Sequence, residues 1–127
     1  MSKVIISTET APAAIGIYSQ AVASNGVLYI SGQIPLVPST MALVSTDIGQ
    51  QIDQVFQNLN AICLTAGTTL NQAIKFTIYL TDLAHFAKVN HYMEGILAAP
   101  YPARAVVEVS ALPKDAQVEI DAIIDLT

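Results

Sequence analysis

Charged residues with the chemistry of a binding or catalytic site gather near the end of this sequence, and Arg104 is the first of them. It is the only arginine in the chain, and its neighbours along residues 103–107 are small or apolar. A guanidinium donates two parallel hydrogen bonds to a carboxylate, which suits arginine to anchoring an acid. Arg104 therefore requires an anionic partner. The residues alone leave open whether that partner is Glu108 or Glu119 of the protein or a bound ligand.

Glu119 is the second candidate, because both of its sequence neighbours are apolar. In a regular strand over 117–126 it shares one face with other polar residues, and a solvated strand face is the simpler interpretation from the residues alone. A strand over 103–109 precedes it, so we expect the two strands to pair as a hairpin. The register of that hairpin decides whether Arg104 and Glu119 face the same side.

Asn90 interrupts the apolar stripe of a predicted helix that begins after Thr81 or Asp82. It lies four residues after Phe86 and three before Met93. Leaving such an amide without hydrogen-bond partners costs about 1–3 kcal/mol. A structural bond to a loop or a place in a binding site satisfies it. The stripe consists of Leu83, Phe86, Val89, Met93, Ile96 and Leu97.

Other reactive residue types carry no recognisable site. His85 and His91 lie six residues apart, which is about 240° around a helix, so they cannot share a metal there. The single Cys63 excludes an internal disulfide and lies on an apolar stripe, which indicates a small core residue. The sequence has neither a GxGxxG motif nor a P-loop, so a nucleotide cofactor lacks support. We expect no metal and no cofactor.

The elements that must position these residues follow in the order β-β-β-α-β-α-β-β. Asn25-Gly26 lies between two apolar runs and favours a tight hairpin turn. An apolar stripe over 48–66 predicts a helix with Ser45 or Thr46 as its cap and Gly67 at its end. This order predicts an α+β fold, a mixed sheet with two helices on one face. The predicted strands are 4–6, 20–24, 27–34, 75–80, 103–109 and 117–126.

Composition predicts that the other face of the sheet is also covered. The chain has 127 residues, which predicts one domain over 1–127. Only 12% of its residues are charged and 53% are hydrophobic, against about 25% charged in an average soluble domain. Because so few charged residues are not enough to cover the surface of a small monomer, we expect a second copy of the chain to cover that face of the sheet.

Charge and targeting signals limit the partners. The net charge is −5, and five scattered cations cannot form the basic patch that nucleic-acid binding needs. Residues 10–46 carry no charge, but prolines and polar residues interrupt them, so no membrane span is predicted. The start has no secretory pattern, which predicts a cytoplasmic protein. The cations are Lys3, Lys75, Lys88, Lys114 and Arg104.

Several segments together resemble the reactive intermediate deaminase family, also called RidA or YjgF. They occur in the family's order over nearly all of the chain, and SGQIP, YPAR and the C-terminal VEI are the most specific. The matching segments are 11–20 (APAAIGIYSQ), 31–35 (SGQIP), Asn58-Leu59, Ala66-Gly67, 79–82 (YLTD), Phe86, Val89-Asn90, 101–104 (YPAR), 112–114 (LPK) and 118–120 (VEI).

The resemblance implies a chorismate-mutase-like fold that assembles as a homotrimer with ligand pockets between subunits. It implies a 2-iminobutanoate/2-iminopropanoate deaminase, which hydrolyses reactive imines and enamines such as 2-aminoacrylate to 2-keto acids and ammonia. Pyridoxal-phosphate dehydratases release these intermediates, and the deaminase itself needs no cofactor.

The resemblance also assigns roles to residues of this chain. Arg104 would bind the substrate carboxylate, and Glu119 would hold and activate the attacking water. The Gly32 amide would help to hold the ligand. The residues that would line the pocket are Tyr18, Ser31, Gly32 and Asn90.

Four positions depart from the family pattern and bear on substrate preference. Val106 stands where many members carry cysteine, so no thiol chemistry is assigned, and Ala105 replaces serine or threonine. Ile17 stands where proline is common, and Met41 replaces a loop glycine. The alternative function is a non-catalytic binder or sensor of small carboxylates such as 2-ketobutyrate. RNA cleavage, attributed to some relatives, is opposed by the net charge of −5.

Overall fold

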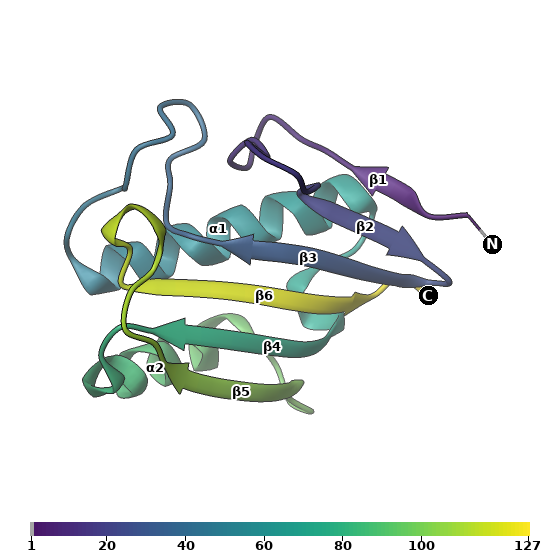
Figure 1. Ribbon diagram of the computed structural model, residues 1–127. Coiled ribbons are helices and arrows are strands. Elements are labelled where there is room, and N and C mark those ends of the chain that lie inside the picture. Colours follow the sequence, from purple (N-terminus) through teal and green to yellow (C-terminus); the bar gives the residue numbers. More distant parts are fainter. Residues whose placement is uncertain (1) are drawn as a thin grey trace.

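The computed structural model describes residues 2–127, which form a mixed β-sheet with two α-helices on one face. Six strands lie in the order β1-β2-β3-β6-β4-β5 (Figure 1). The predicted order of elements along the chain is confirmed. The elements are β1 (Val4–Ile6), β2 (Ala21–Ser24), β3 (Val27–Gln33), α1 (Ile48–Ala66), β4 (Ala73–Leu80), α2 (Phe86–Ile96), β5 (Ala103–Glu108) and β6 (Val118–Asp125), with 3-10 turns η1 (Leu70–Gln72), η2 (Leu83–His85) and η3 (Pro113–Asp115).

The turn between β2 and β3 forms where the sequence predicts it. Asn25 and Gly26 have φ of 52° and 74°, and both residue types tolerate this left-handed region. Ser24 and Val27 are therefore directly paired across the turn. The predicted hairpin is confirmed.

α1 supplies the larger part of the helical layer. Its apolar stripe is buried from Ile48 to Cys63. Gly67 ends the helix with a φ of 85°, and its N–H donates a hydrogen bond to the Leu64 carbonyl at 3.1 Å. The predicted cap was wrong. Asp47 caps the helix by accepting from the Gln50 N–H at 2.9 Å.

α2 is shorter than its predicted stripe. Asp82 caps the 3-10 turn η2 by accepting from the Ala84 N–H at 2.9 Å, and the α-helix begins only at Phe86. Leu83 therefore precedes the helix and is 45% exposed, and Phe86 is 37% exposed, so neither is the core residue that was predicted. The buried part of the stripe consists of Val89, Met93 and Leu97. Neither described helix is both long and apolar enough to cross a bilayer.

The last two strands do not form the predicted hairpin. β5 pairs in parallel with β4, and α2 makes the crossover that parallel neighbours require. β6 lies between β3 and β4, antiparallel to both. Every second residue of β6, from Val118 to Ile124, is buried, whereas β5 has no buried residue. The strand with the continuous buried face therefore takes the centre, and β5 takes the edge.

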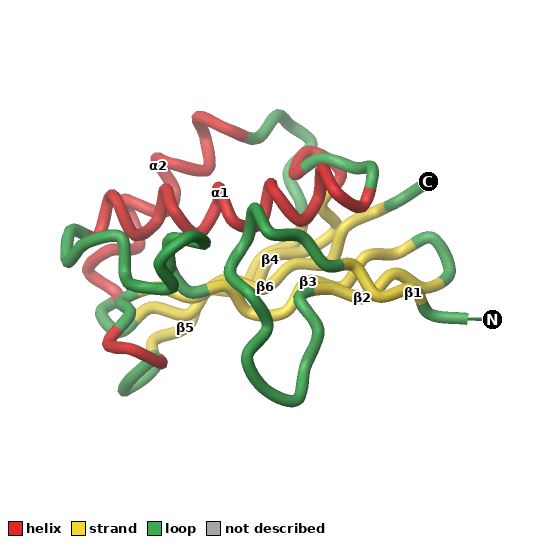
Figure 2. The backbone as a smooth tube through the Cα atoms, turned by 90° about the horizontal axis from the view of Figure 1, so that it is seen from above, coloured by secondary structure: helices red, strands yellow, loops and turns green. Residues whose placement is uncertain are grey.

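The two helices leave the opposite face of the sheet open (Figure 2). Large apolar side chains lie exposed on it: Ile5 is 52% exposed, Tyr29 50% and Val107 42%. Strand pairing joins Ile5 through Val22 to Tyr29, so these side chains share one surface. Exposed apolar surface of this kind is typical of a protein interface. The homotrimer remains a prediction.

Candidate functional site

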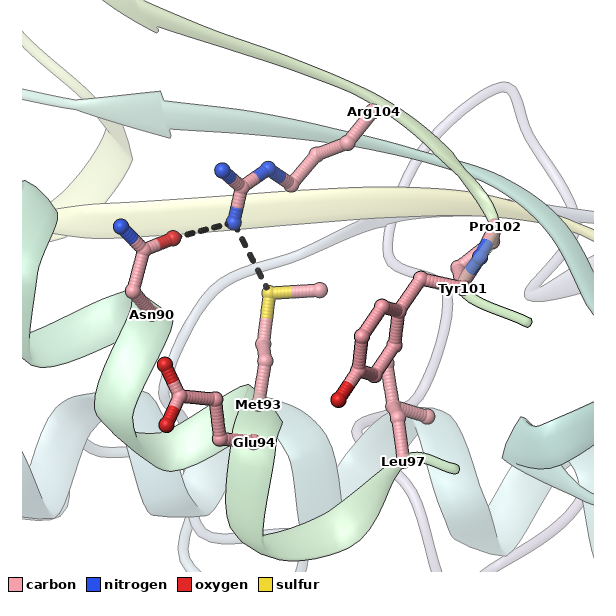
Figure 3. A pocket seen from close by; sticks show the side chains of 7 residues that line it. All are labelled: Asn90, Met93, Glu94, Leu97, Tyr101, Pro102 and Arg104. Carbon is pink, nitrogen blue, oxygen red and sulfur yellow. Dashed lines mark hydrogen bonds between the residues drawn. The ribbon is translucent and has the colours of Figure 1, made fainter. Parts of the chain in front are cut away.

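Arg104 points to the helix side of the sheet, toward α2. Its strand partner is the fully buried Phe76, so both side chains leave the sheet on the covered face. Nη1 donates to Oδ1 of Asn90 and lies 3.8 Å from the sulfur of Met93 (Figure 3). The Arg104 Cζ lies 5.2 Å from the centroid of the Phe86 ring. This side chain is therefore held by neutral groups.

No described carboxylate forms an ion pair with Arg104. Glu108 lies on the same face of β5, but its Oε1 accepts from the Leu83 N–H at 2.9 Å. Glu94 shares a cavity of about 310 Å³ with Arg104, together with Asn90, yet does not pair with it (Figure 3). The remaining walls of this Arg104 cavity are Met93, Leu97, Tyr101 and Pro102. An arginine in a cavity without an acidic partner is suited to an anionic ligand.

The Asn90 side chain is bonded to Arg104 and not to a loop. Its side chain accepts from Arg104 and lines the Arg104 cavity. The amide that interrupts the apolar stripe is thus satisfied by the arginine fourteen residues later in the chain. Asn90 fixes one nitrogen of the guanidinium.

Glu119 points to the open side of the sheet. Its neighbours on β6 are buried toward the helices, and its strand partner is Tyr79. Burial raises the pKa of the half-buried Glu119 carboxyl, and the charge of Asp121 raises this pKa further. A carboxyl with a raised pKa at the wall of a cavity is suited to accepting a proton and returning it.

A second cavity, of about 530 Å³, contains Glu119 and three other predicted site residues. Tyr18 comes from the loop before β2, whereas Ser31 and Gly32 come from β3. The loops around Met41 and Lys114 close the rest of this Glu119 cavity. The structure therefore places Tyr18, Ser31, Gly32 and Glu119 together.

A β-bulge positions Ser31 and Gly32 beside Glu119. Ile30 pairs with Ala122 and Gln33 with Ile120, so two residues of β3 oppose one residue of β6. The Ser31 hydroxyl donates to the Ser19 carbonyl at 2.6 Å, which ties the bulge to the Tyr18 loop. A Cβ on Gly32 would lie 2.3 Å from Oε2 of Glu119. A side chain at this position would therefore force the Glu119 carboxylate to move.

Replacing Gly32 with alanine is expected to displace the Glu119 carboxylate and, for the role that the resemblance assigns to Glu119, to lower turnover by at least about tenfold. The readout is kcat of purified Gly32→Ala with its circular dichroism spectrum. The control is Gly95→Ala in α2, where a Cβ meets nothing within 4 Å. Equal activity of the two variants would contradict the role of Gly32.

Buried amides fix the loops that close the Glu119 cavity. Gln20 donates to the Pro12 carbonyl at 2.8 Å, and Asn58 donates to the Leu36 carbonyl at 3.0 Å. Gln51 accepts a hydrogen bond from the Gln117 N–H at 2.9 Å, where the loop that carries Lys114 leads into β6. These amides were not predicted to support the site. The signal that could have found them is the one that singled out Asn90, a polar amide among apolar residues.

Lys114 was likewise missed as a wall residue. Its Nζ donates to the Met41 carbonyl at 3.2 Å and so bridges two cavity loops 73 residues apart. Met41 and Lys114 have φ of 59° and 58°, in the left-handed region that such side chains rarely adopt. Met41 lies directly in the cavity wall.

The two groups of predicted residues lie on opposite faces of one sheet. Arg104 pairs with Phe76 and Glu119 pairs with Tyr79, so the two lie on either side of β4, three positions apart along it. Strand spacing and rise place their Cα atoms on the order of 14 Å apart. The expected hairpin register therefore does not apply, because β5 and β6 are not paired with each other. Within one chain, the sheet itself separates Arg104 from Glu119.

The remaining reactive residues lie elsewhere. Cys63 is fully buried in the core, as predicted, and burial raises the pKa of its thiol to about 12. His91 is exposed and His85 is partly exposed. Among residues 2–127, no group of three His, Cys, Asp or Glu side chains is arranged to hold a metal ion.

Known proteins match this chain over nearly its whole length. A family model described as Endoribonuclease L-PSP matches residues 8–125. A conserved Rid-family protein from Yersinia pestis, YyfA, is 48% identical in its crystal structure, with a TM-score of 0.94 over 98% of this chain and 99% of its own. The 2-iminobutanoate/2-iminopropanoate deaminase of Mus musculus is 43% identical over 94% of this chain and 88% of its own length.

A further solved structure bears on ligands. The crystal structure of TdcF from E. coli with bound serine is 38% identical, with a TM-score of 0.89 over 98% of this chain and 99% of its own. The matches extend across both cavities and the whole sheet. The chain belongs to the reactive intermediate deaminase (RidA, YjgF) family.

Proposed function

We propose that this protein hydrolyses reactive 2-imino and 2-enamino acids, such as 2-aminoacrylate, to 2-keto acids and ammonia. The observation that carries the proposal is Arg104, which faces a cavity and is paired with no described carboxylate. A relative named as an imine deaminase and another with bound serine both point to a small carboxylate as the ligand. We propose a cytoplasmic location, no cofactor and no nucleic-acid partner, in keeping with the net charge of −5.

The complete site forms between copies of the chain. One sheet separates Arg104 from Glu119, so the two reach one substrate only if they come from different subunits. The open face with Ile5, Tyr29 and Val107 is the surface through which copies associate. We propose a homotrimer with three such sites, in which each subunit contributes Arg104 and Asn90 to one site and Glu119, Tyr18, Ser31 and Gly32 to another.

The reaction follows from these groups. Arg104 binds the substrate carboxylate through two parallel hydrogen bonds, which fixes C2 of the imine. The group that reacts is the protonated imine, which for an enamine such as 2-aminoacrylate is the tautomer protonated at C3. Glu119 accepts a proton from water as the water oxygen bonds to C2 and the C=N electron pair moves to nitrogen, giving a neutral carbinolamine. The same carboxyl returns the proton to nitrogen, the C–N bond breaks and ammonia leaves. Loss of the hydroxyl proton then completes the 2-keto acid, so the step consumes one water and releases one ammonia.

The test couples a pyridoxal-phosphate enzyme that produces 2-aminoacrylate to this protein and traps the remaining intermediate as its semicarbazone. Suppression of trapping by the wild-type protein is the expected result. Unchanged trapping would contradict deaminase activity on this substrate. A non-catalytic binder of 2-keto acids is the second candidate, favoured by an Arg104 cavity that does not contain Glu119, so that a carboxylate is bound there without the proposed base. That protein would bind 2-ketobutyrate and leave trapping unchanged.

Mixing two inactive variants tests the shared site. Arg104→Ala and Glu119→Gln subunits, unfolded together in equal amounts and refolded, should regain about one quarter of wild-type activity, because one interface in four combines an intact Arg104 with an intact Glu119. Each variant refolded alone is the control. A site within one chain predicts no recovery. Light scattering should give about 40 kDa, three times the 13.5 kDa chain, and a monomer would contradict the assembly.

A further inference from the structure

Phe86 is an aromatic residue that the core does not use. It is 37% exposed at the start of α2 and belongs to none of the buried clusters, although phenylalanine ordinarily contributes to a core. Its ring instead lies 5.2 Å from Cζ of Arg104, within the range of a cation–π interaction. The position of this ring is therefore explained by the arginine.

The contacts of Arg104 divide between one nitrogen, Nη1, and the aromatic ring of Phe86. Asn90 and Met93 both contact Nη1. The Phe86 ring interacts with the cationic group as a whole and needs none of its N–H donors, which lie in the guanidinium plane. No described residue accepts a hydrogen bond from Nε or Nη2. The donors that a carboxylate would use are thus left available.

Phe86 does not line the Arg104 cavity of the chain, so its contact with this cavity is through the arginine. Met93 and Asn90 approach from the middle of α2, and Phe86 holds the guanidinium from the first turn of the same helix. A long side chain without such a support samples many rotamers, and ordering it weakens binding. Three residues of one helix therefore restrict Arg104.

We infer that Phe86 is a positioning residue, whose ring holds the Arg104 guanidinium so that the free Nε and Nη2 donors are presented to the carboxylate of the ligand. The inference rests on the proposed function, because it assumes that Arg104 binds a carboxylate. It predicts that an aromatic ring is needed at position 86, and that an aliphatic side chain of similar bulk does not replace it.

The test compares Phe86→Leu, Phe86→Tyr and Leu83→Ala. Leu83 is a similarly exposed apolar residue just before α2, so its truncation controls for loss of surface packing. Phe86→Leu is expected to weaken binding of 2-ketobutyrate by about three- to fivefold, the loss of an exposed cation–π contact. KM for the imine should rise by the same factor while kcat changes less. Phe86→Tyr and Leu83→Ala should keep wild-type affinity.

A spectroscopic measurement reports the contact directly. Arg104 is the only arginine, so its side-chain N–H signals in an NMR spectrum need no further assignment. The ring current of Phe86 should displace them in the wild type and in Phe86→Tyr but not in Phe86→Leu. Unchanged signals and affinity in Phe86→Leu, or equal weakening in Leu83→Ala, would overturn the inference. Failure of the wild type to bind 2-ketobutyrate would contradict the proposed function, whereas wild-type binding with an unaffected Phe86→Leu overturns only the role of Phe86.

Discussion

Arg104→Ala is expected to lower kcat/KM for an imino acid by about 100- to 1000-fold, because it removes two charge-assisted hydrogen bonds to the substrate carboxylate. The measurement is the semicarbazone-trapping assay, together with titration of 2-ketobutyrate. Binding of the keto acid should be lost in parallel, since the same carboxylate is bound in both experiments. Arg104 forms no described ion pair, so no buried carboxylate is left uncompensated by its removal.

Two further measurements test whether the loss is due to the paired N–H donors of the guanidinium. Arg104→Lys keeps the charge but replaces the planar pair of donors by a single ammonium, so its activity should lie between those of Arg104→Ala and the wild type. The fold and oligomer mass of Arg104→Ala should stay as in the wild type, because the side chain lies exposed in a cavity. Wild-type turnover by Arg104→Ala would contradict the proposed carboxylate anchor.

Glu119→Gln is expected to lower kcat by about 100- to 10,000-fold, the range for loss of a general base, while 2-ketobutyrate still binds. This split separates Glu119 from Arg104, whose loss abolishes binding as well. Because Glu119 must be ionised to accept a proton, wild-type kcat should rise with pH through a midpoint above the 4.5 of an ordinary glutamate. The variant should lack that rise.

Asp125→Asn is the matched control for Glu119→Gln. Asp125 lies on the same face of β6 but outside the Glu119 cavity, so its neutralisation should leave kcat and the pH profile near the wild type. A similar loss of kcat in both variants would show that the charge of the strand matters and not the position of Glu119. Full activity of Glu119→Gln with intact 2-ketobutyrate binding would favour a different proton acceptor.

Stability should change in the opposite sense to activity. Burial raises the pKa of Glu119 in the folded chain, so the folded state binds this proton more tightly than the unfolded state does. Ionisation of Glu119 therefore lowers stability as pH rises from the ordinary value through the raised one. At pH 7 the Glu119→Gln variant, which has no charge to bury, should melt at or above the wild-type temperature, and the difference should shrink below pH 4.5.

Local features of the fold were predictable because short-range chemistry determines them. Asn25-Gly26 specifies a tight turn through its tolerance of positive φ, and the stripe over 48–66 specifies α1 through its spacing. The start of α2 was not predictable in this way. Asp82 caps a 3-10 turn that displaces Leu83 from the helix, and an apolar stripe does not reveal such a turn.

By itself, the sequence determined which residues carry the chemistry: a sole arginine among small residues, a glutamate between apolar neighbours, and an amide on an apolar stripe. These are properties of residue type and local spacing, so no fold is needed to find them. Only the tertiary structure decided how Arg104 and Glu119 are related. Strand order and register depend on pairing between distant segments. β5 and β6 pair with the two edges of β4 in registers that place Arg104 and Glu119 on opposite faces of one sheet. The close approach of Gly32 to Glu119 and of Phe86 to Arg104 likewise arises from contacts across strands and helices, which local sequence patterns do not encode.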